Sequence, residues 1–263
     1  MQKRHPEWNW SWLYTPYGDD EYIDLDKLNK VQCDLYYMYK IAKEDYVIIL
    51  GDFGLIWNYK GESKHEKYWL DWLDERPFTT LFIDGNHENY DRLIEYPEEY
   101  WNGGWVQKIR PSVIHLMRGE IFNIGGKTIF AMGGAASHDI SDGVLKIDDP
   151  RIKQWSKDPF KMFRVNHVSW WEQEVPSISE RIHAVENLAK VRLTVDFVLS
   201  HEGPASTVAL LGGGFYKPDE YSQWLEELRA KITYDKWYFG HYHEDRYVTN
   251  DEICKYEAIN QIA

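Results

Sequence analysis

The sequence contains few cysteines, no excess of positive charge and no long apolar run. Its two cysteines, Cys33 and Cys254, lie too far apart in the 263 residues to form a spaced thiolate motif. Two isolated thiols are typical of a reducing compartment rather than of a disulfide-bonded secreted protein. No apolar stretch reaches the length of a membrane span, and no signal-peptide core follows the charged N-terminal residues. We therefore expect a cytoplasmic protein with no membrane association.

Acidic residues outnumber basic ones by 43 to 30, so the formal net charge is −13. This charge argues against broad binding of a nucleic-acid backbone or an anionic membrane. A small phosphorylated substrate remains compatible with it, because a bound cation inverts the local field. The 43% of hydrophobic residues and the 13 tryptophans are enough for a large core. With no repeat or linker, residues 1–263 are expected to form a single domain. The oligomeric state stays open.

The first third of the sequence alternates between strand and helix patterns. The expected strands span residues 8–12, 46–50 and 79–83, and the expected helices span residues 24–43 and 64–74. Successive strand–helix–strand units favour an α/β sheet with parallel neighbours.

From about Val113 the pattern changes to short strands around a Gly125-Gly126 turn, which predicts an antiparallel meander up to Met132. Residues 133–177 show no regular period, and we expect a loop-rich excursion there. The rest alternates again, with helices over 178–191 and 218–231 and strands over 194–199, 236–239, 246–249 and 253–262.

A polar side chain that can bind a metal follows each of four apolar strand patterns: Asp52, Asn86, His201 and His241. The carboxyl ends of such strands are where α/β proteins collect ligands. One carboxylate, one amide and two imidazoles suit Mn²⁺, Fe²⁺ or Zn²⁺, and the two imidazoles count against Ca²⁺ and Mg²⁺. Each residue alone is more often structural, since Asp-Gly-Asn, for example, is turn composition. Four such coincidences favour a site for one or two ions.

The neighbours of these residues extend the chemistry. His243, two residues after His241, can serve an adjacent ion, and the two oxygens of Asp52 can bridge two ions. A pair of ions activates water and clamps the oxygens of a phosphoryl transfer. His87, next to Asn86, is placed to donate a proton to the leaving oxygen or to stabilise charge on it.

The ordered segments Gly51-Asp52, Gly85-Asn86-His87-Glu88, Ser200-His201 and Gly240-His241-Tyr242-His243 resemble the signature of calcineurin-like metallophosphoesterases. The resemblance implies a four-layer α/β/β/α sandwich of two mixed sheets with a dinuclear site. It makes Asp52 the bridging ligand and His87 the catalytic histidine. The other implied ligands are Asn86, His201 and His241 at one ion and His243 at the second. The implied substrates are phosphate monoesters or diesters of small or nucleotide-like molecules.

The family pattern begins with Asp-x-His, and no such pair precedes Gly51 here. Thr15 and Tyr17 stand in the expected place, and a hydroxyl and a phenol are poor ligands for a divalent ion. Three alternatives remain open. Asp19, Asp20 or His5 replaces the missing ligands, one ion is held firmly and the second weakly, or hydrolysis is lost and a binding or scaffold protein remains. The presence of His87 and of one full ligand set favours hydrolysis.

Two further residues are weaker candidates for substrate binding. Arg118 can pair with a phosphate through two N–H groups, and His138 lies in a glycine-rich loop from which it can reach the site. For both residues, a structural role in loop packing is the alternative.

Overall fold

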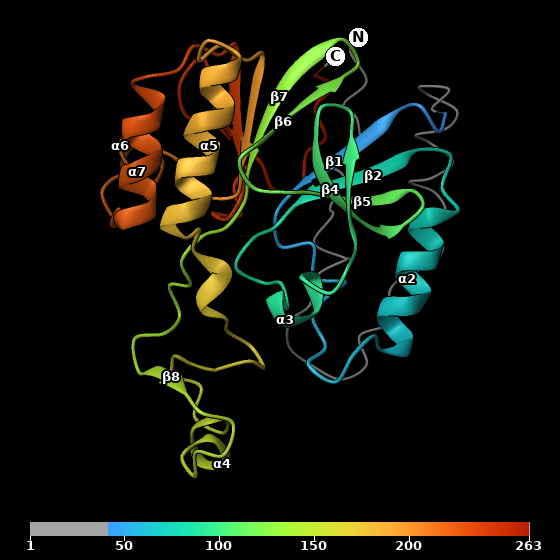
Figure 1. The fold of residues 1–263 in the computed structure, drawn as a ribbon. Coiled ribbons are helices and arrows are strands. Elements are labelled where there is room, and N and C mark those ends of the chain that lie inside the picture. The colour runs from blue at the N-terminus through green and yellow to red at the C-terminus, as the bar shows by residue number, and fades with distance from the viewer. Residues whose placement is uncertain (1–41, 263) are drawn as a thin grey trace, which may run out of the picture.

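The computed structural model describes residues 42–262 (Figure 1). The strand expected over 8–12, nearly all of the helix expected over 24–43, and Thr15 and Tyr17 therefore lie outside the described residues. Residues 42–45 lead into the first described strand without helical structure. None of the helices in the described part of the chain is long and apolar enough to cross a membrane.

The strands form two large sheets and one small one. The first sheet contains β1 (Tyr46–Leu50), β2 (Thr79–Ile83), β3 (Glu98–Trp101), β4 (Gly104–Arg110) and β5 (Val113–Leu116). The second contains β6 (Glu120–Ile124), β7 (Lys127–Met132), β10 (Phe197–Ser200), β11 (Lys236–Phe239), β12 (Arg246–Tyr247) and β13 (Glu252–Cys254). The small sheet pairs β8 (Gly143–Leu145) with β9 (Phe163–Val165). The helices are α2 (Lys64–Asp74), α3 (Tyr90–Leu93), α4 (Ile152–Trp155), α5 (Ile178–Lys190), α6 (Ala205–Leu211), α7 (Glu220–Arg229) and the 3₁₀ helix η2 (Glu172–Glu174).

Both large sheets are mixed, with parallel strands at their centres. The first has the order β1-β2-β5-β4-β3, in which β1, β2 and β5 run parallel. The second has the order β12-β13-β11-β10-β7-β6, with β13, β11, β10 and β7 parallel and antiparallel strands at both edges. The predicted α/β fold with two mixed sheets is confirmed, and so is the β1–α2–β2 unit. The parallel centres bring several carboxyl strand ends to one edge.

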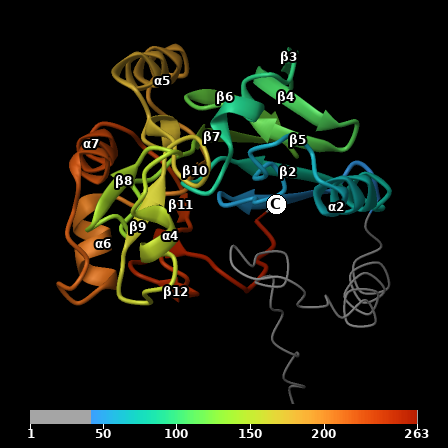
Figure 2. The ribbon, with the colours of Figure 1, turned by 90° about the horizontal axis from the view of Figure 1, so that it is seen from below.

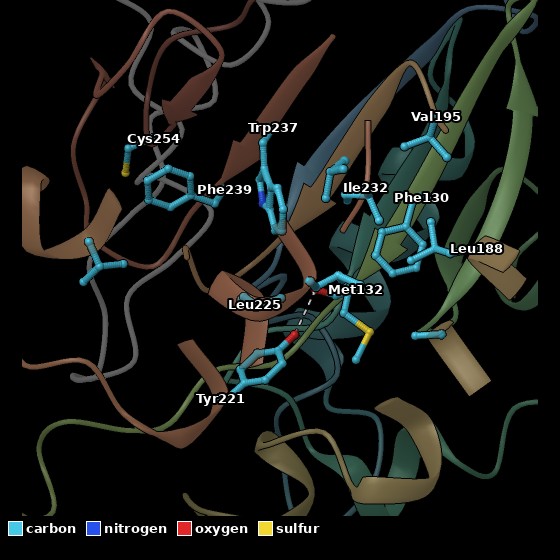
Figure 3. Packing of buried hydrophobic residues seen from close by; sticks show 14 of the residues in the cluster. Phe130, Met132, Leu188, Val195, Tyr221, Leu225, Ile232, Trp237, Phe239 and Cys254 are labelled. Carbon is cyan, nitrogen blue, oxygen red and sulfur yellow. Dashed lines mark hydrogen bonds between the residues drawn. The ribbon is translucent and has the colours of Figure 1, made fainter. Parts of the chain in front are cut away.

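The core lies in three layers, as expected when successive side chains of a strand point to opposite faces. Leu81 and Ile83 of β2 pack between the two sheets, whereas Phe82 packs against α2. On the far side, α5, α6 and α7 cover the second sheet, and there the Tyr221 hydroxyl donates to the Met132 carbonyl oxygen (3.4 Å; Figure 3). Figure 2 shows these three helices on one side of the sheets and α2 on the other.

The helices that cover the sheets begin at side-chain caps. Ser63 accepts from the Glu66 amide at the start of α2, and Ser177 does the same for Glu180 at the start of α5. In both cases the glutamate carboxylate accepts the backbone N–H of the capping serine. The two bonds satisfy N–H groups that the helix itself leaves unpaired. Helix α2 ends at Asp74, shortly before Arg76-Pro77, as its sequence pattern predicts.

The meander predicted after Val113 is confirmed for its strands and for the hairpin turn at Gly125-Gly126, but wrong in joining β5 to that hairpin. Strand β5 pairs with β2 and β4 in the first sheet, whereas the hairpin of β6 and β7 belongs to the second sheet. All four residues of β5 are buried, which fits a strand with neighbours on both edges and layers on both faces. Strands β3 and β4 were not predicted.

The last predicted strand is also too long, because pairing covers only Glu252–Cys254. Just beyond it, the carboxylate of Asp245 accepts the backbone N–H groups of residues 256, 257 and 258. Donors that are bonded to a side chain are not available for a strand ladder. The strand expected over 194–199 instead begins at Phe197, and Thr194 forms only an isolated bridge with Thr233.

The excursion, residues 133–177, contains only short elements: β8, α4, β9 and η2. Its tip, with β8 and α4, projects away from the two large sheets (Figure 1). Both ends of the excursion return to the carboxyl edge of the sheets, because it leaves from β7 and rejoins the chain at α5. Side chains of the excursion therefore lie beside the loops that follow β1, β2, β10 and β11, which we call the strand-end loops.

Candidate metal centre

Two glycines let the strand-end loops close around one histidine. Gly51 follows β1 with φ +91°, and a Cβ added to it would lie 2.1 Å from His201 Nδ1. A Cβ on Gly85 would lie 2.2 Å from Asp52 Oδ1. Side chains at either position would push the loops apart. Asp52 itself has φ 52°, an unfavourable backbone region for a residue with a side chain, and such strain gathers at functional sites.

Three of the predicted ligands meet at this point. His201 Nε2 lies 3.2 Å from Asp52 Oδ1 and 3.3 Å from Asn86 Oδ1. The other ring nitrogen, Nδ1, lies 2.6 Å from the carbonyl oxygen of Leu50 and donates to it. This bond fixes the orientation of the ring, so that Nε2 faces the two oxygens. Loops from β1, β2 and β10 therefore bring together His201 Nε2 and two oxygens that lie within 3.3 Å of it.

The charges of this cluster favour a cation. Burial by itself would raise the pKa of Asp52, but the adjacent His201 and His87 lower it far below its usual range. Burial opposes protonation of His201, yet Asp52 raises the pKa of that imidazole above its usual value. The position between these atoms thus attracts positive charge strongly. A divalent ion competes with a proton for such ligands.

Asn86 is turned toward the cluster by a residue of the excursion. Its amide Nδ2 donates to Ser137 Oγ at 3.2 Å. Ser137 in turn donates to Glu174, from Oγ to Oε2 at 2.8 Å and from its backbone N–H to Oε1 at 2.7 Å. With the amide nitrogen held in this way, the amide oxygen faces His201. Sequence patterns gave no indication of this role for Ser137 or Glu174.

His241 lies beside the cluster, with its ring 5.1 Å from that of His201. Its Nε2 is buried and has no hydrogen-bond partner among residues 42–262. The nearest carboxylate oxygen, Glu202 Oε2 at 3.9 Å, is buried and equally without a partner within that range. His243 is exposed and stacks on Tyr256, with 4.6 Å between the ring centroids.

His87, the predicted catalytic residue, joins the cluster through its backbone, because its N–H donates to Asp52 Oδ1 at 3.0 Å. Its ring stacks on Trp57, and its Nε2 lies 3.3 Å from Arg164 Nη2. Burial, and then the charge of Arg164, lower the pKa of His87, although Asp52 opposes the shift. Burial and the neighbouring cation therefore both disfavour the imidazolium form of this side chain.

Arg164 is a functional candidate that sequence reasoning missed. It lies on β9 in the excursion, and only 4% of its surface is exposed. Asp139 holds it, with Arg164 Nε at 2.8 and 3.0 Å from the two carboxylate oxygens. A single arginine in an irregular segment has no spacing that marks it, so no local pattern was available to find it.

Arg118 lies in a different environment from the one expected for a phosphate ligand. It is buried, and its Nε and Nη2 contact Asp84 Oδ2 at 2.7 and 2.5 Å. Nη2 also contacts the carbonyl oxygen of Gln173 at 2.8 Å. These contacts favour the structural alternative for Arg118, which connects the end of β5 to the excursion. The other weak candidate, His138, does reach the site, because its ring lies 4.9 Å from that of His241.

Glu88 was not predicted to have a role, yet it ties two strand-end loops together. Its carboxylate accepts the backbone N–H of Phe53 at 2.5 Å and that of Gly85 at 2.7 Å. Burial, and then the charges of Asp52 and Asp84, raise the pKa of Glu88 to about 8. We assign Glu88 to loop structure rather than to ion binding.

The residues present fit a divalent transition ion. The set combines imidazole, carboxylate and amide donors, which is the mixed chemistry such ions bind. Buried polar groups normally find a partner. The buried atoms His241 Nε2 and Glu202 Oε2 have none within the described residues, as expected of groups that face an ion.

Comparison with known proteins agrees with this chemistry. The family model for calcineurin-like phosphoesterases matches residues 19–245. The chain is also similar to the lariat debranching enzyme of Schizosaccharomyces pombe, with 31% identity over 115 residues. That match covers 40% of this chain and 23% of the yeast enzyme, so it spans less than a quarter of the relative. Because the family model covers most of its length, this chain belongs to the calcineurin-like phosphoesterase family.

Proposed function

We propose that this protein is a metal-dependent phosphoesterase that hydrolyses a phosphate monoester or diester. The observation that carries the proposal is the meeting of Asp52, Asn86 and His201, which come from three separate strand ends. Family membership supports phosphoester hydrolysis as the reaction class. The donor chemistry of the cluster and its attraction for positive charge support metal dependence.

Asp52, Asn86 and His201 would hold the ion, and His241 is the fourth ligand that the family resemblance implies. When bound, such an ion makes water a nucleophile at neutral pH and polarises a phosphoryl oxygen. The protein's own residues do the rest. Arg164, held by Asp139, places a positive charge beside His87, which would favour the negative charge of a phosphoryl group. His87 lies between Asp52 and Arg164, where it can donate a hydrogen bond to the leaving oxygen.

The substrate class that we propose is a small phosphorylated or nucleotide-like molecule. The formal charge of −13 speaks against recognition of a long nucleic-acid backbone. The yeast relative is named as a lariat debranching enzyme, but it shares only a limited segment with this chain. A short branched oligonucleotide therefore belongs in the substrate panel, beside simple monoesters and diesters.

The proposal is tested with the full chain, stripped of metal by a chelator and then supplied with Mn²⁺. Hydrolysis of p-nitrophenyl phosphate or bis(p-nitrophenyl) phosphate should appear only with the ion and should be abolished in Asn86→Ala. His87→Ala should lower kcat at least about 100-fold, the usual contribution of a positioned acid or base. His65→Ala, at an exposed histidine on α2, is the matched control and should leave the rate unchanged.

The competing proposal is that the protein has the same fold but acts only in binding or as a scaffold. The observation that favours it is the presence of Thr15 and Tyr17 in place of the first pair of ligands. Protein that binds Mn²⁺ and phosphate yet turns over no monoester, diester or branched oligonucleotide would establish that alternative and defeat our proposal.

A further inference from the structure

A second group of potential ligands lies on the far side of His241 from the chemistry above. His138 projects from the excursion, and its ring lies 4.9 Å from that of His241 at an interplanar angle of 41°. Its chain neighbours are both fixed: Ser137 hydrogen-bonds to Glu174, and Asp139 forms an ion pair with the arginine of β9. An exposed histidine is thus held next to a buried one by the contacts of the residues on either side.

Glu202 completes the group. One potential ligand atom from each of His138, Glu202 and His241 lies within 4.8 Å of the other two. Glu202 is 1% exposed, and its Oε1 accepts the Gly203 N–H at 2.8 Å and the hydroxyl of Tyr242. These bonds orient the carboxylate, so that Oε2 faces His241.

The distance between His241 Nε2 and Glu202 Oε2 separates two interpretations. At 3.9 Å the two atoms are too far apart for a hydrogen bond, which needs at most about 3.2 Å. Zinc ligands lie about 2.0–2.2 Å from the ion, so two of them lie roughly 3–4 Å apart. Neither atom has another partner among residues 42–262, although both side chains are more than nine-tenths buried. The gap is the one that a divalent cation would fill.

We propose that His138, Glu202 and His241 bind a second divalent cation, of the kind that takes two imidazoles and one carboxylate, such as Zn²⁺. His241 then serves this ion through Nε2, while Asp52, Asn86 and His201 serve the first. This assignment differs from the family pattern, which places His241 at the first ion. In this assignment the second ion needs no ligand from the Asp-x-His position, where this chain has Thr15 and Tyr17. The inference depends on the proposed function only in taking Asp52, Asn86 and His201 as the ligands of the first ion.

The test measures zinc binding to the full chain and does not depend on turnover. Metal-free protein is titrated with Zn²⁺ by calorimetry, and bound zinc is counted by elemental analysis after desalting. Two ions per chain are expected. His138→Ala should bind one ion, with the zinc affinity of the second site lowered at least about 100-fold. Replacing even a residue that only hydrogen-bonds to a ligand typically lowers metal affinity 10- to 100-fold. Because His138 is exposed, this variant should fold normally.

Two further variants separate the sites. Asn86→Ala should also bind one ion, but the remaining ion should be the one that His138→Ala loses, so the double variant should bind none. His167→Ala is the matched control, since His167 is an exposed histidine of the same excursion that pairs with Asp91. It should bind two.

Several outcomes would overturn the inference. If His138→Ala keeps the full zinc content and affinity of the wild type, the group does not bind an ion. If Glu202→Gln weakens zinc binding and His138→Ala does not, Glu202 only orients His241. A single ion that Asn86→Ala removes and His138→Ala leaves in place refutes the second site and keeps the proposed function. A single ion that His138→Ala removes and Asn86→Ala leaves in place supports this inference and contradicts the proposed function. Protein that binds no zinc refutes both.

Discussion

The strand-end loops and the excursion supply the site in different ways. In the loops, Asp52 and His201 come within one or two residues after the ends of parallel strands, so hydrogen bonding in the sheets fixes where each side chain begins. The excursion has little regular structure, and its residues reach the site through side-chain contacts such as that of Ser137 with Asn86. The loops therefore provide the ligands of the first ion from a rigid scaffold, whereas the excursion provides positive charge, orientation and the proposed ligand His138. This is a familiar division between scaffold and variable segment.

The largest effect is expected at Asp84, a strand-end residue that ties the two regions together. Its carboxylate and its partner Arg118 are both nearly fully buried, 2.5 Å apart at the closest. Asp84→Ala leaves the guanidinium buried without its main counter-charge, which typically costs about 3–5 kcal/mol of unfolding free energy. Urea denaturation followed by tryptophan fluorescence measures this loss.

The matched control is Asp71→Ala, which removes the half-exposed partner of Lys67 and Arg110 and should cost at most about 2 kcal/mol, about 1 kcal/mol for each surface pair. Because Arg118 also contacts the carbonyl oxygen of Gln173, Asp84→Ala should speed proteolytic cleavage within the excursion. Equal losses from the two aspartate variants would mean that the Asp84–Arg118 pair does not join the loops to the excursion.

The next effect tests the rigidity of the loops. Gly51→Ala would place a Cβ 2.1 Å from His201 Nδ1, so the histidine ring would have to move. A displacement of about 1 Å at a reacting group can cost about 100-fold in rate, and we expect a loss of that order in kcat/KM. Gly61→Ala is the control, because Gly61 has a similar φ of +108° but nothing within 4 Å. If both variants lose the same activity, backbone strain rather than contact with His201 is the cause.

The difference between the two regions also explains what the sequence could predict. Asp52 and His201 were found because a short apolar run indicates a strand, and the polar residue that follows the run stands out. Glu88 and Ser137 act through hydrogen bonds to residues 35 and 51 positions away, and no local pattern carries such information. The meander failed for a related reason, since β5 and β6 have similar composition but pair in different sheets. Element type is largely local, whereas pairing and contacts across the site are not.

A third prediction concerns the loop that carries Trp57, the residue stacked on His87. Glu66 holds this loop, because its Oε1 accepts the N–H groups of Trp57 at 2.7 Å and Asn58 at 2.8 Å. Glu66→Gln should cost about 1.5–3 kcal/mol at neutral pH, the usual worth of hydrogen bonds to a charged group. Glu62→Gln, at an exposed neighbour, should cost less than about 1 kcal/mol.

The stabilisation by Glu66 should depend on pH in a defined direction. Burial tends to raise the pKa of Glu66, but the N–H groups that it accepts lower the pKa below its usual 4.5. The folded state then binds a proton less readily than the unfolded state. The stabilisation is complete above pH 4.5 and is lost as the pH falls through the folded pKa. In Glu66→Gln this part of the acid dependence should disappear. An unchanged acid profile would show that the loop does not depend on this carboxylate.

The smallest effect is expected in the excursion and separates its role from that of the loops. Arg164→Ala removes the guanidinium next to His87 and should lower kcat/KM about tenfold, the equivalent of 1.4 kcal/mol. The content of bound metal should stay the same, because the contacts that hold Arg164 go to Asp139, Ser169 and His87, none of which is a proposed ion ligand. Arg164→Lys should recover only part of the rate, since an ammonium cannot reproduce the two-oxygen contact with Asp139. Arg151→Ala, at an exposed arginine of the same segment, should change nothing. If Arg164→Ala loses metal together with activity, the excursion is part of the scaffold, and the contrast between the two regions disappears.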